Sequence, residues 1–574
     1  MIDPSRRSPT VPRPCLPQRA CVPRFAQRAV AAVVAASLFA GGPLQAAIGS
    51  EAVPGVTPPA PSAANLPALG DSAAEGLSPA GERALGDRIM RDIWRDPAII
   101  EDAELQEHIG TTFARLVAAA RRRGEITPDI EASFAWTPFL VRDRTVNAFA
   151  LPGGYVGVHL GLIAMTPNLD ELASVLAHEL SHVTQRHIVR MMSVQQRQSL
   201  VGLAAMILGV IAASRSPQAA QALVTSGQAV AMQGQLNFSR DMEREADRVG
   251  FGVLSTAGYA ESGMAQMFEL LAQASNLNDD GSFPYLRSHP LTVERIGEAR
   301  ARARQAGDFR TQPAVDVVHT LMRARARVLM DPRALAWQRL IADAQAGALP
   351  ASPLEGISPV AVPQPASAPP PAALPVERLA ASYAGTLAAL QMRDLKVSAE
   401  LYERMLRQAE ALPSDQRRGA QRELARLGVE MALVRDDGRA ADAALAQIAG
   451  DSGRVAQFLR ARRALLPGAD LTLQRQCAAV LQTMVAQTPT DAPAWALLSQ
   501  LWDRMGQPLR ALRADAEAVA LHGDLDGAID RLRAGQRRAR GDRTPDFVEI
   551  SVIDARLRTL EQERRRSADE DQKR

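Results

Sequence analysis

The chain has 574 residues, more than one hydrophobic core can organise, so its length predicts two or three domains. Apolar residues make up 47% of the sequence and aromatic residues only 4%, and alanine, leucine and arginine predominate, which favours a mainly α fold. The formal net charge of +3 is too balanced to indicate a nucleic-acid-binding protein, and the arginines are expected on solvated helix faces.

The first segment, residues 1–46, has the pattern of a cleavable signal peptide. An arginine-rich leader precedes the apolar run Ala29–Ala40, which is too short to span a bilayer, and small residues follow around Ala46. An uncleaved membrane anchor is the alternative interpretation. Beyond residue 46 Cys477 is the only cysteine, so no internal disulfide is expected and stability must come from packing.

A flexible lead-in at 47–80 is followed by helical periodicity, and residues 81–312 are expected to form one domain. Helices are predicted for Gly81–Trp94, Glu104–Arg123, Leu172–His187 and Asp241–Gly258. A strand is expected at Ser133–Asp143, and a β-hairpin with a Pro-Gly-Gly turn at Thr145–Met165. The apolar stretch Ser199–Ser214 is short for a membrane span, so a buried or interfacial helix is expected, with a span or a peripheral lipid contact as the alternative.

Connecting helices at 313–347 lead into a proline-rich stretch at 348–375, which is expected to be a linker because so much proline excludes helix. Residues 376–560 have a helical pattern, and 561–574 form a charged tail. The segment Asp491–Leu532 fits a repeat of about 34 residues that is typical of tetratricopeptide repeats, and Ser382–Leu406 fits it more loosely. A plain bundle of helical hairpins is the alternative.

The sequence HELSH, from His178 to His182, carries the clearest chemical signal. Two histidines four residues apart lie on one helix face about a turn apart, so their imidazoles can share one metal ion. Glu179 can act as general base on a water bound to that ion, whose pKa zinc lowers. The pattern favours one zinc ion per chain and hydrolytic chemistry; ordinary surface polarity is the alternative.

A zinc hydrolase needs a third protein ligand and one open position. His187 is not expected to be that ligand, because in a continuous helix it points away from both histidines and is structural or exposed. Glu243 and Asp247, four residues apart on a downstream helix, are better candidates. Glu243 can bind the metal while Asp247 accepts a hydrogen bond from a ligand imidazole, although the interleaved arginines also fit a solvated charged face.

HELSH followed by SRDMEREADRVG resembles the zinc metallopeptidases of family forty-eight, and the match runs over about residues 81–300. The resemblance implies that His178, His182 and Glu243 are the zinc ligands. It also implies that Glu179 is the catalytic base.

Two other stretches are similar to elements of this family. The hairpin sequence NAFALPGGYVGVHLGL implies a strand edge that pairs with an extended substrate, where Gly153 and Gly154 would allow the backbone to approach. SHPLTVERI is similar to an HPxxxxRI element, whose histidine holds the open zinc position in the beta-barrel assembly-enhancing protease type. By this resemblance His289 is a gate; a His-Pro turn that only caps the domain is the alternative.

The resemblance therefore implies an HExxH zinc-protease domain with a small β-hairpin or sheet, followed by α-helical tetratricopeptide-like repeats. Its function would be that of a periplasmic zinc metalloendopeptidase for unfolded or misassembled outer-membrane proteins, which docks on barrel assembly machinery through the repeats. The proline-rich stretch and the lack of paired cysteines depart from that type. A chaperone or scaffold with a closed or structural zinc site is the alternative. No pattern identifies the group that stabilises the oxyanion; Arg295 and Tyr285 are candidates without further support.

Overall fold

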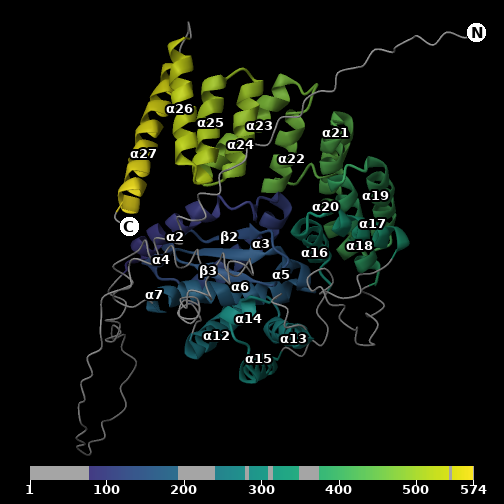
Figure 1. The fold of residues 1–574 in the computed structure, drawn as a ribbon. Helices are drawn as coiled ribbons and strands as arrows, with labels where there is room; N and C mark the ends of the chain where they lie inside the picture. The colour runs from purple at the N-terminus through teal and green to yellow at the C-terminus, as the bar shows by residue number, and fades with distance from the viewer. Residues whose placement is uncertain are drawn as a thin grey trace, which may run out of the picture. The chain divides into compact units, whose positions relative to one another are not determined.

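The computed structural model describes residues 77–191, 239–277, 283–307, 315–347, 374–541 and 546–572 (Figure 1). Over these ranges the protein is mainly helical with one small sheet, as expected. The predicted signal peptide, the stretch Ser199–Ser214 and nearly all of the proline-rich stretch lie outside the described residues. Within the described ranges, no helix has both the length and the apolar character that crossing a membrane requires.

The sheet has four strands in the order β1-β2-β4-β3. They are β1 (Ile99–Ile100), β2 (Thr137–Val141), β3 (Ala148–Leu151) and β4 (Tyr155–His159). β3 and β4 form the predicted hairpin, and β2 runs parallel to β4. The second apolar run of the hairpin is shorter than expected, because the chain turns into the helix α5 (Leu160–Met165). Among the strands that the structure describes, β3 pairs only with β4, so its other side is an edge of this sheet.

The two glycines of the hairpin turn have a packing role. Gly153 and Gly154 have φ of +77° and +90°, the left-handed region that favours glycine. A Cβ at Gly153 would lie 2.8 Å from Cα of Arg83 on α2 (Pro79–Ile93), and one at Gly154 would lie 3.0 Å from the backbone nitrogen of Trp136. The backbone that approaches these glycines is therefore the protein's own, in contrast to the expectation that they make room for a substrate.

The helix α6 (Leu169–Thr184) lies at the centre of the N-terminal half, and all its residues from Glu171 to Thr184 are buried. It packs against β3 and against α3 (Ala103–Arg122), α12 (Arg240–Thr256) and α13 (Ser262–Leu277). Asn168 caps the helix, since its side-chain oxygen accepts a hydrogen bond from the backbone nitrogen of Glu171 at 3.0 Å. A helix covered on all sides explains why the sequence around HELSH is apolar all round.

The remaining helices extend the fold on both sides of the proline-rich stretch. Before it lie α4 (Pro128–Ser133), α7 (His187–Met191), α14 (Tyr285–Ser288), α15 (Val293–Gln305), α16 (Val317–Met330) and α17 (Ala334–Ala346). After it come α18 (Leu374–Gln391), α19 (Leu395–Glu410), α20 (Ser414–Val434), α21 (Gly438–Gln447), α22 (Arg454–Ala464), α23 (Leu471–Gln487), α24 (Ala492–Arg504), α25 (Pro508–Leu521), α26 (Leu525–Arg540) and α27 (Phe547–Gln572).

The segment that fits the 34-residue repeat forms consecutive helices that pack in order. Trp495 lies on α24, which packs against α25, and α25 packs against α26 (Figure 1). Gly506, with φ of +70°, makes the turn between α24 and α25. Cys477 on α23 is buried in the apolar core that α22, α23, α24 and α25 share. The tetratricopeptide assignment stays a prediction, and these helix pairs are consistent with it.

Buried ion pairs join α3 to α16 and α20. Arg426 on α20 lies 2.9 Å from Glu104 on α3, and both side chains are only 3% exposed. Arg325 on α16 lies 2.8 Å from Asp102, the N-cap residue of α3. Because a buried charge is costly without a counter-charge, these contacts fix where α3 meets the C-terminal helices.

Candidate metal centre

The HELSH sequence places three ionisable side chains on the buried helix α6. Nε2 of His178 and Nε2 of His182 lie 3.0 Å apart, as the four-residue spacing predicted, and both residues are 1% exposed. Glu179, between them in the sequence, is fully buried. Burial is unfavourable for the charged carboxylate and raises the pKa of Glu179.

The helix α12 brings Glu243 to these histidines. Ser239 caps this helix, accepting a hydrogen bond from the backbone nitrogen of Met242. Oε2 of Glu243 lies 3.5 Å from Nε2 of His178, and its Oε1 lies 3.5 Å from Nε2 of His182. The approach of α12 to α6 depends on Gly250, where a Cβ would lie 3.1 Å from the carbonyl oxygen of Ala177.

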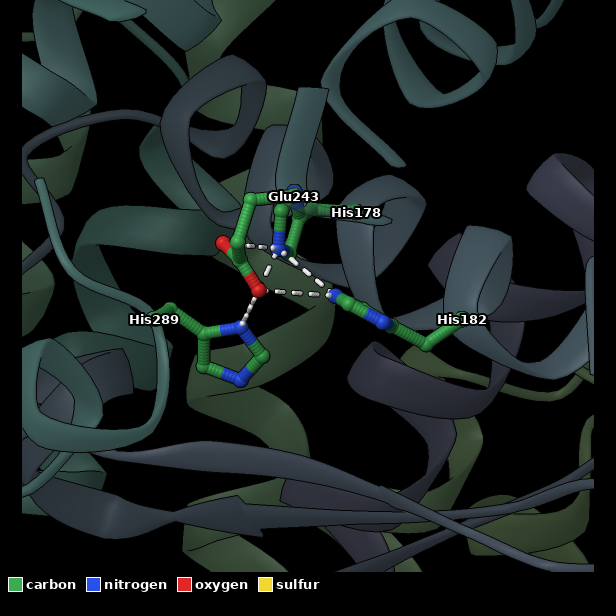
Figure 2. A group of neighbouring side chains, drawn as sticks. All are labelled: His178, His182, Glu243 and His289. Atoms are coloured by element: carbon green, nitrogen blue, oxygen red, sulfur yellow. Dashed lines mark hydrogen bonds and ion pairs between the residues drawn. The ribbon is translucent and has the colours of Figure 1, made fainter. Parts of the chain in front are cut away.

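His289 completes the cluster from the turn between α14 and α15 (Figure 2). Its Nδ1 lies 2.9 Å from Oε1 of Glu243 and 3.3 Å from Nε2 of His178. Its Nε2 lies 3.5 Å from Oε1 of Glu179. The ring of Tyr285 stacks on the His289 ring with centroids 4.7 Å apart.

The four side chains fit a metal ion. One ligand atom from each of His178, His182, Glu243 and His289 lies within 4.8 Å of the others, and all four residues are buried. Around a tetrahedral zinc ion with bonds of about 2.0–2.1 Å, neighbouring ligand atoms are about 3.3 Å apart. The distances given above between ligand atoms of this cluster are 2.9 to 3.5 Å. Three imidazoles and one carboxylate are a donor set that zinc accepts.

Asp247 lies behind the cluster, where the sequence predicted it. Its Oδ1 is 2.9 Å from Nδ1 of His178, the ring nitrogen that faces away from the metal position. Burial opposes ionisation of Asp247, but hydrogen bonds from Arg295 and His178 outweigh burial and lower its pKa. An ionised Asp247 holds one proton of His178 on Nδ1 and fixes the orientation of the ring, so that a metal ion would bind Nε2 by displacing the proton there.

Arg295 supports the same carboxylates and was not assigned this role from the sequence. Its guanidinium binds Asp247 through two hydrogen bonds of 2.7 and 2.8 Å, and it lies 2.9 Å from Glu243. The HPxxxxRI element could have suggested it, because His289 and Arg295 belong to the same short motif. Tyr285, the other oxyanion candidate, contacts His289 instead.

The carboxylates and imidazoles shift one another's protonation. Burial alone would lower the pKa of His178, but Asp247 and Glu243 raise it to about 10. Burial and the neighbouring histidines lower the pKa of His182 well below its ordinary value. Burial would raise the pKa of Glu243, yet His289 and His178 lower it. Glu243 is thus ionised and His182 neutral, the forms in which both bind a metal.

His187 does not point away from the cluster, and the geometric argument from the sequence is wrong on this residue. The helix α6 ends at Thr184, and Arg186 has a φ of +51°, which turns the chain back. His187 is therefore buried, with Nδ1 2.9 Å from Nδ1 of His182 and Nε2 3.0 Å from Glu245. His187 is not part of the four-ligand group, and because it is buried it is a structural residue and not an exposed one.

Comparison with known proteins places this geometry in a family. Residues 107–303, which include every member of the cluster, match Peptidase family M48. A beta-barrel assembly-enhancing protease of Yersinia pestis is 35% identical over 295 residues, which cover 51% of this chain and 57% of that protein. The Escherichia coli (strain K12) protein of the same name is 35% identical over 257 residues, covering 45% of this chain and 51% of that one.

A more distant relative is the mitochondrial metalloendopeptidase OMA1 of Saccharomyces cerevisiae, 27% identical over 223 residues, which cover 38% of this chain and 61% of that protein. The chain matches about half the length of the two bacterial relatives. The matched segment contains HELSH, the helix α12 and His289, and with them the whole cluster. Residues 107–303 of this chain are therefore a domain of peptidase family M48.

Proposed function

We propose that this chain is a zinc-dependent metalloendopeptidase with His178, His182 and Glu243 as the metal ligands. The observation that carries the proposal is the group of buried ligand atoms within 4.8 Å of one another, with the carboxylate of Glu179 beside it. The match to a peptidase family over the same residues supports it.

In the proposed reaction, the side chains of the site have separate roles. Zinc, when bound, would supply a Lewis acid that polarises the peptide carbonyl. Glu179 accepts the proton of the attacking water and passes it to the leaving amine, a role suited by the raised pKa that burial gives it. Asp247 and Arg295 hold the ligand side chains in place.

The substrate is proposed to bind as an extended segment along β3. This strand is an edge of the sheet and packs against α6, which carries Glu179. An extended peptide can add to such an edge through backbone hydrogen bonds, whatever its side chains. Folded proteins do not offer a free extended segment, so unfolded or misassembled proteins are the substrates that this edge selects.

His289 is proposed to gate the site. Its Nδ1 takes the fourth position of the ligand group, which a zinc hydrolase keeps open for water and substrate. Cleavage therefore requires the His289 side chain to swing away from Glu243 and His178. A closed resting site protects neighbouring proteins from digestion.

The cellular location and the substrate proteins of this enzyme are proposed from the names of its relatives and from residues 1–46. Two relatives are named beta-barrel assembly-enhancing proteases, and residues 1–46 have the pattern of a cleavable signal peptide. Together these support a periplasmic enzyme whose clients are outer-membrane barrel proteins. The C-terminal helices would dock on the assembly machinery.

A chaperone or scaffold is the second candidate, favoured by the occupied fourth position. If His289 never leaves, the metal only stabilises the fold and the C-terminal helices carry the function. The two candidates differ in whether the role in the cell depends on Glu179.

The test compares wild type, Glu179→Gln, His178→Ala and His289→Ala for metal content by mass spectrometry and for casein digestion. Glu179→Gln should keep the metal and lose cleavage by about 100-fold or more. His178→Ala should lose the metal, and His289→Ala should digest casein faster than wild type. Metal retained by His178→Ala would refute the ligand assignment. A cellular role that survives Glu179→Gln would establish the scaffold instead.

A further inference from the structure

A cavity of about 340 Å³ lies between α16, α17 and α18, outside the metal centre. Five arginines line it: Arg144, Arg323, Arg327, Arg333 and Arg339. Its apolar wall is formed by Met330, Leu335 and Leu340 with several alanines, most of them on α18. A volume of this size, with an apolar wall and a few charged groups, is typical of a site for a small ligand or a single side chain.

The charges of the cavity favour an anion. Its five guanidinium groups face only three carboxylates, those of Asp331, Asp343 and Glu377, which leaves an excess of two positive charges. Asp331 is already held by Arg333 at 2.5 Å, and Glu377 by Arg323 at 3.2 Å. Asp331 also lies 3.4 Å from Arg144, so two of the three lining carboxylates are already paired with arginines of the lining.

Two arginines have capacity for that ligand. Arg323 is only 6% exposed, and its Nε is buried without a hydrogen-bond partner in the described part of the chain. Arg339 is exposed at the cavity and forms no ion pair with any described residue. A buried donor without a partner is costly, so an acceptor that reaches Nε of Arg323 removes that cost. The exposed Arg339 would add a charge-assisted hydrogen bond to the same ligand.

The cavity also lies on one side of the proposed substrate path. Arg144 belongs to the loop between β2 and β3 and precedes Ala148, the first residue of β3, by four positions. A peptide that pairs antiparallel with β3 runs from the Leu151 end towards the Ala148 end. Its C-terminal side therefore leaves the sheet next to the loop that carries Arg144.

We propose that this cavity binds the C-terminal residue of the protein substrate, with the free α-carboxylate on the arginines and an apolar side chain against Met330, Leu335 and Leu340. The inference rests on the proposed function, because it takes the extended substrate along β3 as its starting point. Arginine forks match a carboxylate in two hydrogen bonds, and the apolar wall matches an uncharged last residue. The volume suits one residue better than the acyl chains of a phospholipid, the other anionic amphiphile that arginines attract.

The test measures binding to full-length Glu179→Gln protein, which cannot digest its ligand. The probes are two fluorescein-labelled ten-residue unfolded peptides that end in leucine, one with a free carboxylate and one with a C-terminal amide. Fluorescence anisotropy should give a dissociation constant at least tenfold weaker for the amide. Arg339→Glu, added to Glu179→Gln, should weaken the free acid to the level of the amide and leave the amide unchanged.

The matched control is Arg475→Glu on α23, an exposed arginine outside the cavity whose replacement changes the net charge equally. It should bind the free acid as the parent does. Arg144→Gln, which makes a smaller change, provides a second variant and should also lose the preference for the acid.

Three outcomes would overturn the proposal. The first is equal affinity for the acid and the amide, and the second is an amidated peptide with an internal glutamate that binds as tightly as the free acid. The third is displacement of the free acid by dihexanoyl phosphatidic acid at a lower concentration than by unlabelled peptide. The last would identify a lipid phosphate site. Because no arm requires cleavage, a failure of the peptidase proposal in casein digestion leaves this result interpretable, and the reverse also holds.

Discussion

At the scale of single residues, the positions of Asp247 and Arg295 matter as much as those of the metal ligands. Asp247 contacts the rear nitrogen of His178 at 2.9 Å, and Arg295 holds Asp247 and Glu243 at the same time. Each carboxylate is buried, so each depends on its partners to stay ionised. The affinity of the proposed zinc site would therefore depend partly on residues that do not bind the metal.

Replacing Asp247 by asparagine should weaken zinc binding by about 10- to 100-fold, because the amide cannot hold the proton of His178 on Nδ1 as a carboxylate does. Competition with a chromogenic chelator measures the affinity directly. Asp241→Asn is the matched control, since Asp241 lies on the same helix with its side chain 92% exposed. Equal affinities for the two variants would mean that Asp247 does not support the site.

The residues of the site were predictable to different degrees, for physical reasons. His178 and His182 follow from helical spacing alone, and Glu243 with Asp247 repeats that spacing on a second helix. The position of His187 could not be predicted, because nothing about an arginine signals that Arg186 adopts a left-handed backbone. Arg295 could not be assigned either, since its role depends on how α15 meets α12.

At the scale of elements, the site depends on how closely α12 approaches α6. Gly250 makes this contact, and a Cβ there would lie 3.1 to 3.2 Å from the backbone of Ala177 and His178. Glu243 and Asp247 lie on the same helix, about two turns and one turn before Gly250, respectively. A shift of α12 at this point moves both carboxylates relative to the histidines.

Gly250→Ala should therefore lower the free energy of unfolding by about 1–3 kcal/mol, as overpacking does, and weaken zinc binding as well. Gly297→Ala on α15 is the control: it adds the same methyl group with no atom within 4 Å, so it should be neutral or slightly stabilising. Urea denaturation and chelator competition are measured on both variants. A Gly250→Ala protein with unchanged zinc affinity would show that the contact between α12 and α6 does not set the geometry of the metal site.

The first turn of α6 carries a second element-scale feature. Burial is the main cause that raises the pKa of Glu171 to about 7. The folded protein then holds a proton that the unfolded chain, with an ordinary glutamate pKa, has lost between about pH 4.5 and 7. The contribution of Glu171 to stability thus falls as the pH rises through this window.

Glu171→Gln removes that dependence, so the variant should gain stability relative to wild type by about 2–3 kcal/mol between pH 5 and pH 8. Urea titrations followed by circular dichroism at the two pH values measure this double difference, in which any fixed packing effect of the amide cancels. A difference that does not change with pH would show that Glu171 is solvated in the folded protein.

At the scale of the whole molecule, buried charged residues as well as apolar ones mark where α3 meets the C-terminal helices. Arg426 lies within 2.9 Å of Glu104, Glu107 and Asp451, which come from α3 and from the segment after α21. Burial and the nearby Glu423 raise the pKa of Glu104 well above its ordinary value. This group of acids is held together by one guanidinium.

Arg426→Met should cost about 3–5 kcal/mol in the free energy of unfolding, because it leaves buried carboxylates without their counter-charge. The exposed Arg475→Met should change stability by no more than about 0.5 kcal/mol. Urea denaturation of both proteins at neutral pH gives the comparison. A loss as small as that of the control would mean that water reaches these acids.

The order of elements could be predicted from the sequence, whereas their contacts could not. Helical periodicity located α2, α3, α6 and α12 and the turn signal located the hairpin, since each depends on local residues. The parallel pairing of β2 with β4 and the burial of Arg325 and Arg426 join residues far apart in the chain. No local pattern encodes such contacts.

The burial of Cys477 makes the protein its own reporter of local opening. Burial raises the pKa of this thiol and shields it from reagents within the core around α23. A thiol reagent can therefore label it only when those helices separate, and the labelling rate follows how often they do so. Mass spectrometry of the peptide that contains Cys477, with and without a bound client, would show whether binding to the protease domain changes how often the C-terminal helices open.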